Sequence, residues 1–231
     1  IIQYIFIEKN NILKKLNTFI QEEFYRRYQV QYSIVRNLPV TNNTPSSEKF
    51  TEPTIIYQGA VNEGRSFETL IPAMKWVDAR LLICGNGNYL KQAKKIVAKE
   101  KLENKIAFLG SIHPDELKLL TTKAHIGVTL FEKTGLNQYY SLANRFFDYL
   151  MAGIPQVCVD YPEYRQINQE YHFALLIDNT SEKSIAEGLN KLLTNAVLYN
   201  TLQNNAIKAR EKLNWTEEEK VLLAFWKNIL S

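Results

Sequence analysis

The amino-acid sequence predicts an α/β protein, built as a Rossmann-like parallel sheet with helices on both faces. From Ile55 onward, short apolar runs alternate with segments of helical period, which is the pattern of parallel strands joined by crossover helices. Most of these runs are apolar at nearly every position, as strands must be when helices cover both faces of a sheet. The alternation and the unbroken apolar runs together predict a doubly wound sheet.

Six apolar runs are the predicted strands. They cover residues 55–58, 81–84, 106–109, 126–131, 156–159 and 174–177. Apolar residues recur at a spacing near 3.6 over residues 67–77 and 90–97, which predicts two crossover helices. Pro114, followed by acidic residues, starts a further helix. Gly153 and Pro155 end another, over residues 143–152.

The chain is predicted to divide into a central domain and two appended segments. Residues 1–50 are interpreted as the tail of a preceding domain and a linker, with a helix over 12–28 and a strand over 32–35. Residues 51–212 form the Rossmann-like domain. Residues 213–231 form a last amphipathic helix, for which Thr216 and Glu219 have the spacing of a capping box. Because the chain begins at Ile1 without a targeting signal, we expect it to be part of a longer protein.

The composition argues against two broad classes of protein. With 45% hydrophobic and 23% charged residues, the chain resembles an ordinary globular protein. No apolar run approaches the roughly 18 residues that a membrane-spanning helix needs. A formal charge of +4, spread along the chain, provides no basic face for nucleic acid. Cys84 and Cys158 lie in apolar runs, as buried free thiols do, which indicates a reducing, cytoplasmic environment.

Three successive predicted strands are followed by glycine, at Gly59, Gly85 and Gly110. The carboxyl ends of parallel strands meet at one edge of the sheet, where ligands bind and where glycine lets a ligand approach the backbone. A tight turn from strand to helix explains any one of these glycines equally well. Arg65 and Ser66, just ahead of the first crossover helix, suit a diphosphate, although a solvated surface arginine is the plainer interpretation.

Over residues 136–149, polar residues precede a helix that then turns apolar. Asn144 and Asp148 are four positions apart and therefore share a helical face, as Ser141 and Arg145 do beside it. A carboxylate can accept two hydroxyl hydrogen bonds, as needed to hold the vicinal diol of a ribose. The spacing alone is equally compatible with an arginine and an aspartate on an exposed helix face.

Four segments of the chain, taken in order, resemble the glycosyltransferase group 1 superfamily. They are Tyr57-Gln58-Gly59 with Gly64-Arg65, residues 82–87, residues 107–112 and, above all, residues 141–149 with the sequence Ser-Leu-Ala-Asn-Arg-Phe-Phe-Asp-Tyr. The resemblance covers nearly the whole chain and implies the GT-B architecture, in which two Rossmann-like domains face each other across a cleft. This chain resembles the C-terminal, donor-binding half, preceded by a remnant of the acceptor-binding half, toward which the last helix packs back.

The resemblance implies an enzyme that transfers a sugar from a nucleotide-diphosphate donor to a glycan or lipid-linked acceptor in glycan biosynthesis. It implies retention at the transferred sugar, no bound metal and no cofactor besides the donor. It is also compatible with peripheral association at the inner face of the membrane. It assigns no catalytic residue. Because catalysis in this architecture takes place between the two halves, we expect this chain alone to bind nucleotide without transferring sugar.

The same resemblance assigns donor-binding roles to individual positions. They are Gly59, Arg65, Ser111, Ile112, Tyr140, Ser141, Leu142, Asn144, Arg145 and Asp148. Asp148 stands where the family has a glutamate that holds the donor ribose, and Arg65 where a basic residue holds the diphosphate. Asn144 and Arg145 match an Asn-Lys pair at the head of the same helix. Ser111 and Ile112 match the segment beside the nucleobase, and residues 140–142 match the segment under the phosphates and the sugar.

Three positions depart from the family pattern. Ala60 replaces an arginine found in many relatives, which leaves Arg65 as the main side chain that neutralises phosphate. Asp148 is one methylene shorter than the family's glutamate, and Tyr140 lies near the place of a missing upstream acid. These departures keep open an alternative, a non-catalytic module for nucleotide binding or assembly.

A sugar-nucleotide epimerase or hydrolase of the same architecture is the other alternative. Such an enzyme is expected to offer acid and base groups near the cleft, for which His113, His125 and His172 are the candidates. Each of the three is equally well explained as a histidine at a helix end or in the packing.

Overall fold

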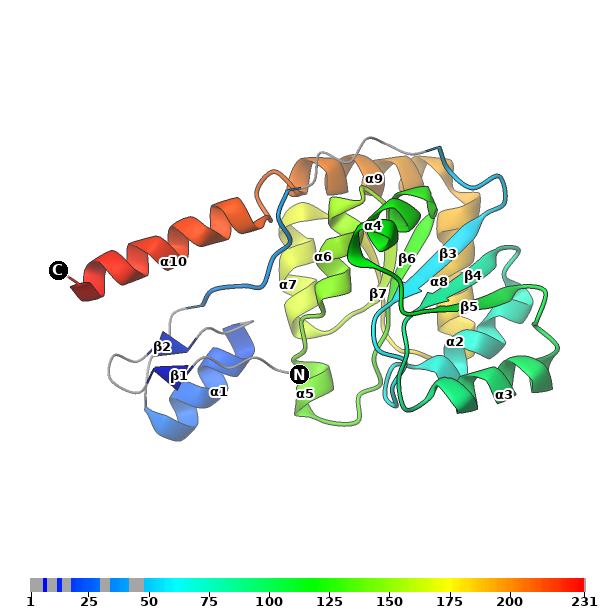
Figure 1. Ribbon diagram of the computed structural model, residues 1–231, viewed down its shortest axis with the longest axis horizontal. Helices are drawn as coiled ribbons and strands as arrows, with labels where there is room; N and C mark the ends of the chain where they lie inside the picture. The colour runs from blue at the N-terminus through cyan, green and yellow to red at the C-terminus, as the bar shows by residue number, and fades with distance from the viewer. Residues whose placement is uncertain (1–5, 8–11, 14–17, 30–33, 42–47, 231) are drawn as a thin grey trace.

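The computed structural model describes residues 6–7, 12–13, 18–29, 34–41 and 48–230, and within them the predicted parallel sheet is present (Figure 1). Its strands are β3 (Thr54–Gln58), β4 (Arg80–Cys84), β5 (Ile106–Gly110), β6 (Ile126–Thr129), β7 (Gln156–Val159) and β8 (Ala174–Ile177). They lie in the order β5-β4-β3-β6-β7-β8, and every neighbouring pair is parallel. The predicted fold class is therefore confirmed. The strand predicted over 126–131 is too long, because the ladder ends at Thr129.

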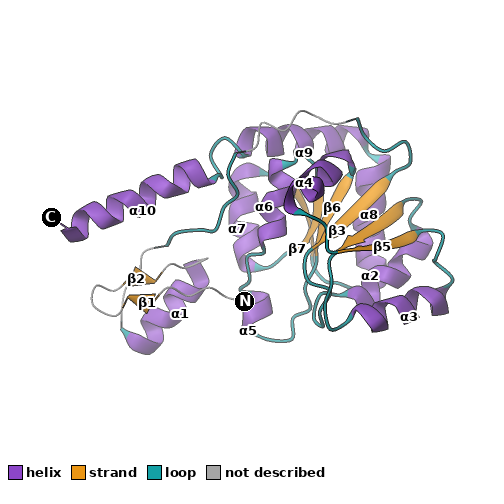
Figure 2. Ribbon diagram, viewed as in Figure 1, coloured by secondary structure: helices purple, strands orange, loops and turns teal. Residues whose placement is uncertain are grey.

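Helices cover both faces of this sheet (Figure 2). They are α2 (Phe67–Ala73), the 3-10 helix η1 (Met74–Trp76), α3 (Leu90–Glu100), α4 (Pro114–Lys123), α5 (Leu136–Tyr139), α6 (Asn144–Met151), α7 (Pro162–Tyr171), α8 (Glu182–Thr194) and α9 (Ala196–Ala209). Pro114 begins α4 as predicted, because its fixed φ suits the first helical position. Gly153, just past α6, has a φ of 63°, the left-handed conformation that ends a helix and favours glycine.

Alternate residues of the central strands pack on opposite faces of the sheet. Ile55 and Ile83 belong to the large core cluster, together with Phe67 of α2 and Val97 of α3. Ile56, Leu82 and Cys84 belong to a second cluster that includes Tyr149 of α6, with Leu117 and Leu120 of α4 packed against it. The strands are thus covered on both faces, as their unbroken apolar runs require. Cys84 and Cys158 are both free and buried, as predicted.

The N-terminal segment differs from its prediction. Ile12 and Leu13 form β2 (Ile12–Leu13), which pairs antiparallel with β1 (Phe6–Ile7), so the predicted start of a helix at Ile12 is wrong. The helix α1 runs over Thr18–Tyr28 instead. Of the strand predicted over 32–35, Tyr32 and Ser33 lie outside the described residues. Ile34 forms a single bridge and Val35 lies in no strand.

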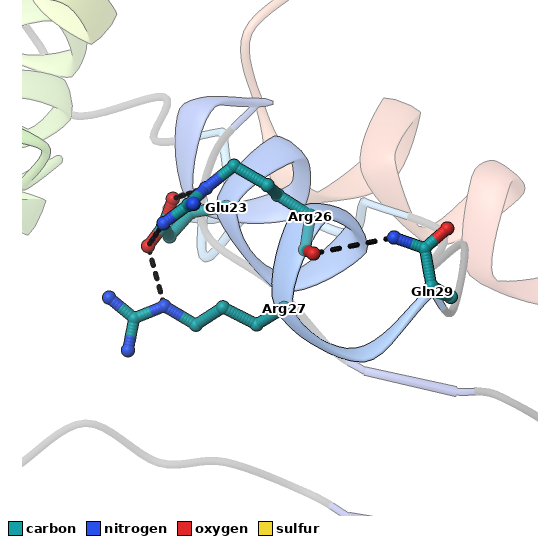
Figure 3. Close-up of polar contacts among 4 residues, drawn as sticks. All are labelled: Glu23, Arg26, Arg27 and Gln29. Carbon is teal, nitrogen blue, oxygen red and sulfur yellow. Dashed lines mark hydrogen bonds and ion pairs between the residues drawn. The ribbon is translucent and has the colours of Figure 1, made fainter.

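The exposed face of α1 carries a small ion-pair group (Figure 3). Arg26 Nε and Arg27 Nε donate to the Glu23 carboxylate at 2.9 and 2.5 Å, and these bonds hold the pKa of Glu23 down to about 2. Gln29, with a φ of 54°, ends the helix and donates from Nε2 to the Arg26 carbonyl. Exposed pairs of this kind contribute little to stability. The attachment of α1 to the sheet domain includes a bond from the Phe19 N–H to Glu163 of α7, at 3.0 Å.

The last helix, α10 (Trp215–Leu230), extends away from the sheet (Figure 1). The predicted capping role of Thr216 is wrong, because the helix starts at Trp215 and Thr216 already lies in its first turn. Asn214 caps it instead: Oδ1 accepts from the Glu217 N–H at 3.1 Å, and Nδ2 donates to the Arg210 carbonyl at 2.9 Å. None of the helices in the described ranges is long and apolar enough to cross a membrane. The domain boundaries stay predictions.

We expect Asn214→Ala to lower the free energy of unfolding by about 1–2 kcal/mol, because it removes the cap of α10 and leaves buried polar groups without partners. Thr216→Ala is the matched control. Thr216 is exposed and is the residue that the sequence predicted as the cap, and its replacement should change stability by less than about 0.5 kcal/mol. Urea denaturation of both variants makes the measurement. A larger loss for Thr216→Ala than for Asn214→Ala would contradict the observed cap.

Candidate functional site

The order of the strands reverses between β3 and β6. From β3 the chain runs outward through β4 to β5, then crosses back to β6 and continues outward through β7 to β8. Helices that follow β3 and β6 therefore leave in opposite directions, and a crevice is expected beyond the carboxyl ends of these two strands. Ligands of open α/β sheets bind at such a point. The candidate site is therefore built at the ends of β3 and β6.

Tyr149 of α6 contacts both of these strands. Its hydroxyl lies between the two strands, 3.1 Å from the Ile56 carbonyl and 3.4 Å from the Val128 carbonyl, and it accepts a hydrogen bond from the Gln58 N–H at 3.2 Å. The ladder between β3 and β6 includes only the register pairs Ile55↔Ile126 and Ile56↔Gly127. The phenol accepts from one backbone N–H of β3 and has one proton to share between a carbonyl of β3 and a carbonyl of β6, near the place where direct pairing stops.

Gly127 makes the room that this ring needs. A Cβ built at Gly127 would lie 2.4 Å from carbon atoms of the Tyr149 ring, closer than any side chain tolerates. The ring itself is completely buried. The glycine in β6 and the tyrosine in α6 are therefore a matched pair, and together they set the position of α6 relative to the sheet.

Arg145, near the start of α6, is buried at the end of β3. Only 7% of it is exposed. Its Nη1 donates to the Tyr57 hydroxyl at 3.2 Å and to the Gln58 carbonyl at 3.4 Å, and its guanidinium lies 4.6 Å from the ring centroids of both Tyr57 and Phe131. Its Nε and Nη2 are buried and have no hydrogen-bond partner among the described residues. Burying an ionised group with two donors unused is costly, and such groups call for an explanation.

Arg65 brings a second positive charge to the same place. Its guanidinium lies 4.4 Å from the Phe131 ring centroid, so both arginines contact this one aromatic ring. Burial lowers the pKa of Arg65, and the charge of Arg145 lowers it further. In the part of the chain that the structure describes, neither arginine forms an ion pair with a carboxylate. Within those residues the two guanidinium groups therefore have no carboxylate at ion-pair distance.

Asp148 lies on α6 beside this charge and is held by Gln58. The Gln58 Nε2 donates to Asp148 Oδ2 at 2.9 Å, and Thr121 Oγ1 of α4 lies 2.8 Å from Gln58 Oε1. Burial raises the pKa of Asp148 to about 6, although the Gln58 hydrogen bond and the charge of Arg145 act in the opposite direction. At neutral pH the carboxyl is therefore mostly ionised but close to its titration range.

A cavity of about 200 Å³ opens beside Asp148 and Gln58. Its walls are mainly apolar and come from the segment after residue 38, from α4 and from the end of α6. They include Val40, Ile112, Leu117, Met151 and Ala152, with Lys118 as a cation. A mainly apolar cavity with a few convergent polar groups is the usual form of a small-ligand site.

The structure brings together some of the residues that the sequence assigned to the site. Gly59 follows β3 and lies against Arg145, since a Cβ added there would come within 3.2 Å of Nη1. Gly59, Gly85 and Gly110 do lie on one edge, at the ends of the neighbouring strands β3, β4 and β5. Arg65, Arg145 and Asp148 cluster beyond β3, and Ile112 lines the cavity.

Three other assigned residues, Ser111, Asn144 at the start of α6 and Tyr140, make contacts outside this cluster. Ser111 accepts from Asn86 Nδ2 at 2.8 Å, and Asn144 is exposed and accepts from Asn37 Nδ2 at 3.2 Å. Tyr140 stacks on Phe19 of α1, with ring centroids 5.5 Å apart.

Ser141 and Leu142 belong to the packing of the loop before α6. Ser141 donates to the Gln138 carbonyl at 2.8 Å and its oxygen lies 3.3 Å from the Tyr164 hydroxyl. Leu142 is buried in the main core cluster. The structure thus places both residues in the support of α6.

The sequence interpretation assigned no role to Tyr149, Gln58 or Thr121. The available signals were weak: a glutamine ends an otherwise apolar strand, and a glycine interrupts another. None of the three histidines is among the residues that line the cavity, although His113 lies between Ile112 and Pro114, which do. His113 and His172 flank α4 and α7 as end residues, and His125 Nδ1 accepts the Thr54 N–H at 3.0 Å, at the amino end of β3.

Comparison with known proteins gives the family. The profile described as "Glycosyl transferases group 1" matches residues 41–209, well over half of the 231 residues, and the chain therefore belongs to this family. An uncharacterised glycosyltransferase of Methanocaldococcus jannaschii is 25% identical over 183 residues, which span 76% of this chain and 45% of that protein.

Solved structures agree with this fold. Sucrose-phosphate synthase from Thermosynechococcus elongatus matches with a TM-score of 0.75 at 16% identity, covering 95% of this chain and 58% of the other. HepE from Anabaena, in complex with UDP and glucose, matches with a TM-score of 0.75 at 13% identity, covering 95% and 62%. At such identities the likeness shows the fold alone, the Rossmann-like sheet of GT-B glycosyltransferases. The chain spans less than two thirds of the length of each of these relatives.

We expect Gly127→Ala to destabilise the protein by about 1–3 kcal/mol, because the added methyl group must displace the buried Tyr149 ring. Gly135→Ala is the matched control, since Gly135 has an extended φ of 179° and a Cβ there meets nothing closer than 3.4 Å. Urea denaturation compares the two. If both variants lose the same stability, the contact between Gly127 and Tyr149 does not constrain α6.

Proposed function

We propose that this chain is the donor-binding half of a glycosyltransferase and that it holds a nucleotide-diphosphate sugar beyond the ends of β3 and β6. The observation that carries the proposal is the pair of guanidinium groups on Phe131, those of Arg145 and Arg65, with the carboxylate of Asp148 one helical turn after Arg145. The two arginines suit an anionic group of a ligand, and the carboxylate of Asp148 suits a pair of hydroxyl groups. A nucleoside diphosphate has both, in its phosphates and its ribose. Membership of the glycosyl transferases group 1 family supports the same ligand class.

The diphosphate is assigned to the arginine side of the site. Arg65 is the more accessible of the two guanidinium groups, and charge-assisted bonds from arginine to phosphate are among the strongest that a side chain makes. Arg145 lies deeper and acts through its field, which a poorly solvated environment screens little. Ala60, which leaves no side chain to reach the phosphates after Gly59, places this role on Arg65.

The ribose is assigned to Asp148 and the base to the cavity next to it. A cavity of about 200 Å³ compares with the roughly 150 Å³ that holds one benzene molecule, so a planar ring fits between the apolar walls. Ile112 lines this cavity, as the resemblance of residues 111–112 to the nucleobase segment would have it. HepE has been crystallised with UDP-glucose, and Staphylococcus aureus TarM with UDP, which supports a nucleotide in the corresponding fold.

The finer features of the reaction are part of the same proposal. We propose transfer with retention, to a glycan or lipid-linked acceptor held by a second domain, without a cofactor and with arginine in place of a metal as the counter-charge. The proposal keeps a cytoplasmic location, with peripheral contact at the inner face of the membrane. Calorimetric titration with uridine, UDP and UDP-glucose tests it. Failure of all three, and of the matching adenosine and guanosine diphosphates, to bind would refute the donor site, and sugar transfer by this chain alone would refute its role as one half.

Arg65→Ala should weaken binding of UDP about tenfold or more while changing the affinity for uridine less than about twofold, because the lost contact is a charge-assisted bond to phosphate. Arg80→Ala is the control: Arg80 lies at the amino end of β4 and pairs with Glu52 at 3.6 Å. Titration calorimetry on both variants decides the matter. Equal losses for nucleoside and diphosphate would leave Arg65 as a surface residue.

Asp148→Asn should raise the stability of the protein and weaken nucleotide binding at once. The pKa of Asp148 is higher in the folded protein than in the unfolded chain, so its ionisation, complete above about pH 7, costs stability that asparagine does not lose. A gain of about 1–3 kcal/mol at pH 8 that fades below pH 4 is expected.

The same variant should bind UDP about tenfold to a hundredfold more weakly and lose any preference for the ribo over the 2′-deoxyribo form. Thermal unfolding at several pH values and calorimetry with both nucleotides make the measurements. Unchanged affinity in a folded Asp148→Asn variant would remove this residue from the site.

A further inference from the structure

We propose that Gln58 is a positioning residue for Asp148: its side-chain amide holds Oδ2 of the carboxylate and leaves Oδ1 for a hydroxyl of the bound nucleotide. The inference rests on the proposed donor site, which it deepens. Gln58 is the last residue of β3 and is 6% exposed, so its polar side chain ends a strand that is otherwise apolar over residues 55–57. A buried amide at this place needs partners for both of its ends.

The two ends of the amide have different partners, and these fix its orientation. Nε2 donates to Asp148 Oδ2 at 2.9 Å, whereas Oε1 lies 2.8 Å from the Thr121 hydroxyl. Turning the amide over would place its carbonyl oxygen against the carboxylate and its NH2 group against the hydroxyl. The Thr121 hydroxyl also lies 2.6 Å from the Leu117 carbonyl and has one proton to share between the two acceptors. The bond from Thr121 to Gln58 is therefore weaker than the bond from Gln58 to Asp148.

The backbone of Gln58 joins it to the rest of the site. Its N–H donates to the Tyr149 hydroxyl and its carbonyl accepts from Arg145 Nη1. One strand residue therefore contacts three side chains of α6, namely Arg145, Asp148 and Tyr149. The carboxylate is held at a set place relative to the arginines, since strand and helix are joined at this residue.

Besides the neutral amide of Gln58, two charged groups, Arg145 and Lys118, act on the Asp148 carboxyl. Burial raises its pKa, and three influences oppose that rise: the hydrogen bond from Gln58, the charge of Arg145 on α6 and the charge of Lys118 on α4. Both charges remain when Gln58 is replaced. Loss of the amide alone should therefore raise the pKa of Asp148 and free the carboxylate to rotate.

The experiment measures binding of UDP-glucose from pH 5 to 8.5. A sugar nucleotide suits the purpose because it has no terminal phosphate monoester, whose own pKa near 6 would obscure the result. Affinity of the unaltered protein should fall as the pH drops through about 6, where Asp148 takes up a proton. In Gln58→Leu this midpoint should move up by about one pH unit, the size expected for one hydrogen bond to a charged group.

Two further variants separate positioning from general packing. Gln58→Glu puts two carboxyl groups side by side, and such a pair retains one proton to an unusually high pH. While that proton remains, the new side chain can still donate to Asp148, so affinity should persist near pH 6.5 and fall toward pH 8.5, the reverse of the Gln58→Leu profile. Thr121→Val should shift the acid midpoint in the same direction as Gln58→Leu, but by less.

Thermal unfolding shows that each variant is folded before its profile is compared. A Gln58→Leu protein that is folded and has an unchanged acid midpoint would overturn the proposal. If the unaltered protein binds neither UDP nor UDP-glucose, the donor site itself fails. The positioning role is then tested in the ligand-free protein by NMR titration of the Asp148 carboxyl, identified by its loss in Asp148→Asn. A pKa that Gln58→Leu does not raise would again overturn it.

Discussion

The insertion of the Tyr149 hydroxyl between β3 and β6 is the contact on which the candidate site depends. It accepts from the Gln58 N–H of β3 and lies within hydrogen-bond distance of one carbonyl on each strand, and Gly127 gives the ring its space. A buried hydroxyl with such partners is expensive to move, because any shift leaves backbone groups unpaired. The helix α6 is thereby held against the sheet, with Arg145 and Asp148 in the turn before the anchoring residue.

Held in this way, α6 brings two buried charged groups, Arg145 and Asp148, to the end of β3. Arg145 is buried with two donors unused, Arg65 shares its aromatic neighbour, and Asp148 is kept partly ionised where burial favours the neutral form. A sequence selected for stability alone would not retain this arrangement. In the function that we propose, a ligand supplies negative charge to the arginines and hydroxyl groups to the carboxylate, which would offset the cost of burying these groups.

The parts of this fold that depend on apolar runs could be predicted from the sequence. Each strand of the large sheet lies within two residues of its predicted limits, because a strand covered on both faces has an unbroken apolar run. The hairpin formed by β1 and β2 was missed, since strands of two residues have no period to detect. The cap of α10 was placed at Thr216 because its spacing to Glu219 fits a capping box equally well, and only the contacts of Asn214 decide between them.

The residues of the candidate site came from the resemblance to a family, and their contacts could not be predicted from the sequence. Asp148, Arg65 and Arg145 were assigned donor-binding roles in this way, and no pattern of spacing states that an arginine is buried between aromatic rings. Gln58 and Thr121 are 63 positions apart, and their meeting depends on how α4 packs on the sheet.

The contact between Gln58 and Asp148 also offers a physical reason for the aspartate at position 148, where the resembled family has a glutamate. A glutamate would reach roughly 1.5 Å farther, about one carbon–carbon bond. The shorter aspartate instead meets the amide that ends β3 at 2.9 Å. Asp148 and Gln58 are therefore best understood as one unit. The side chain of Gln58, at the end of β3, extends to the carboxylate of the shorter Asp148.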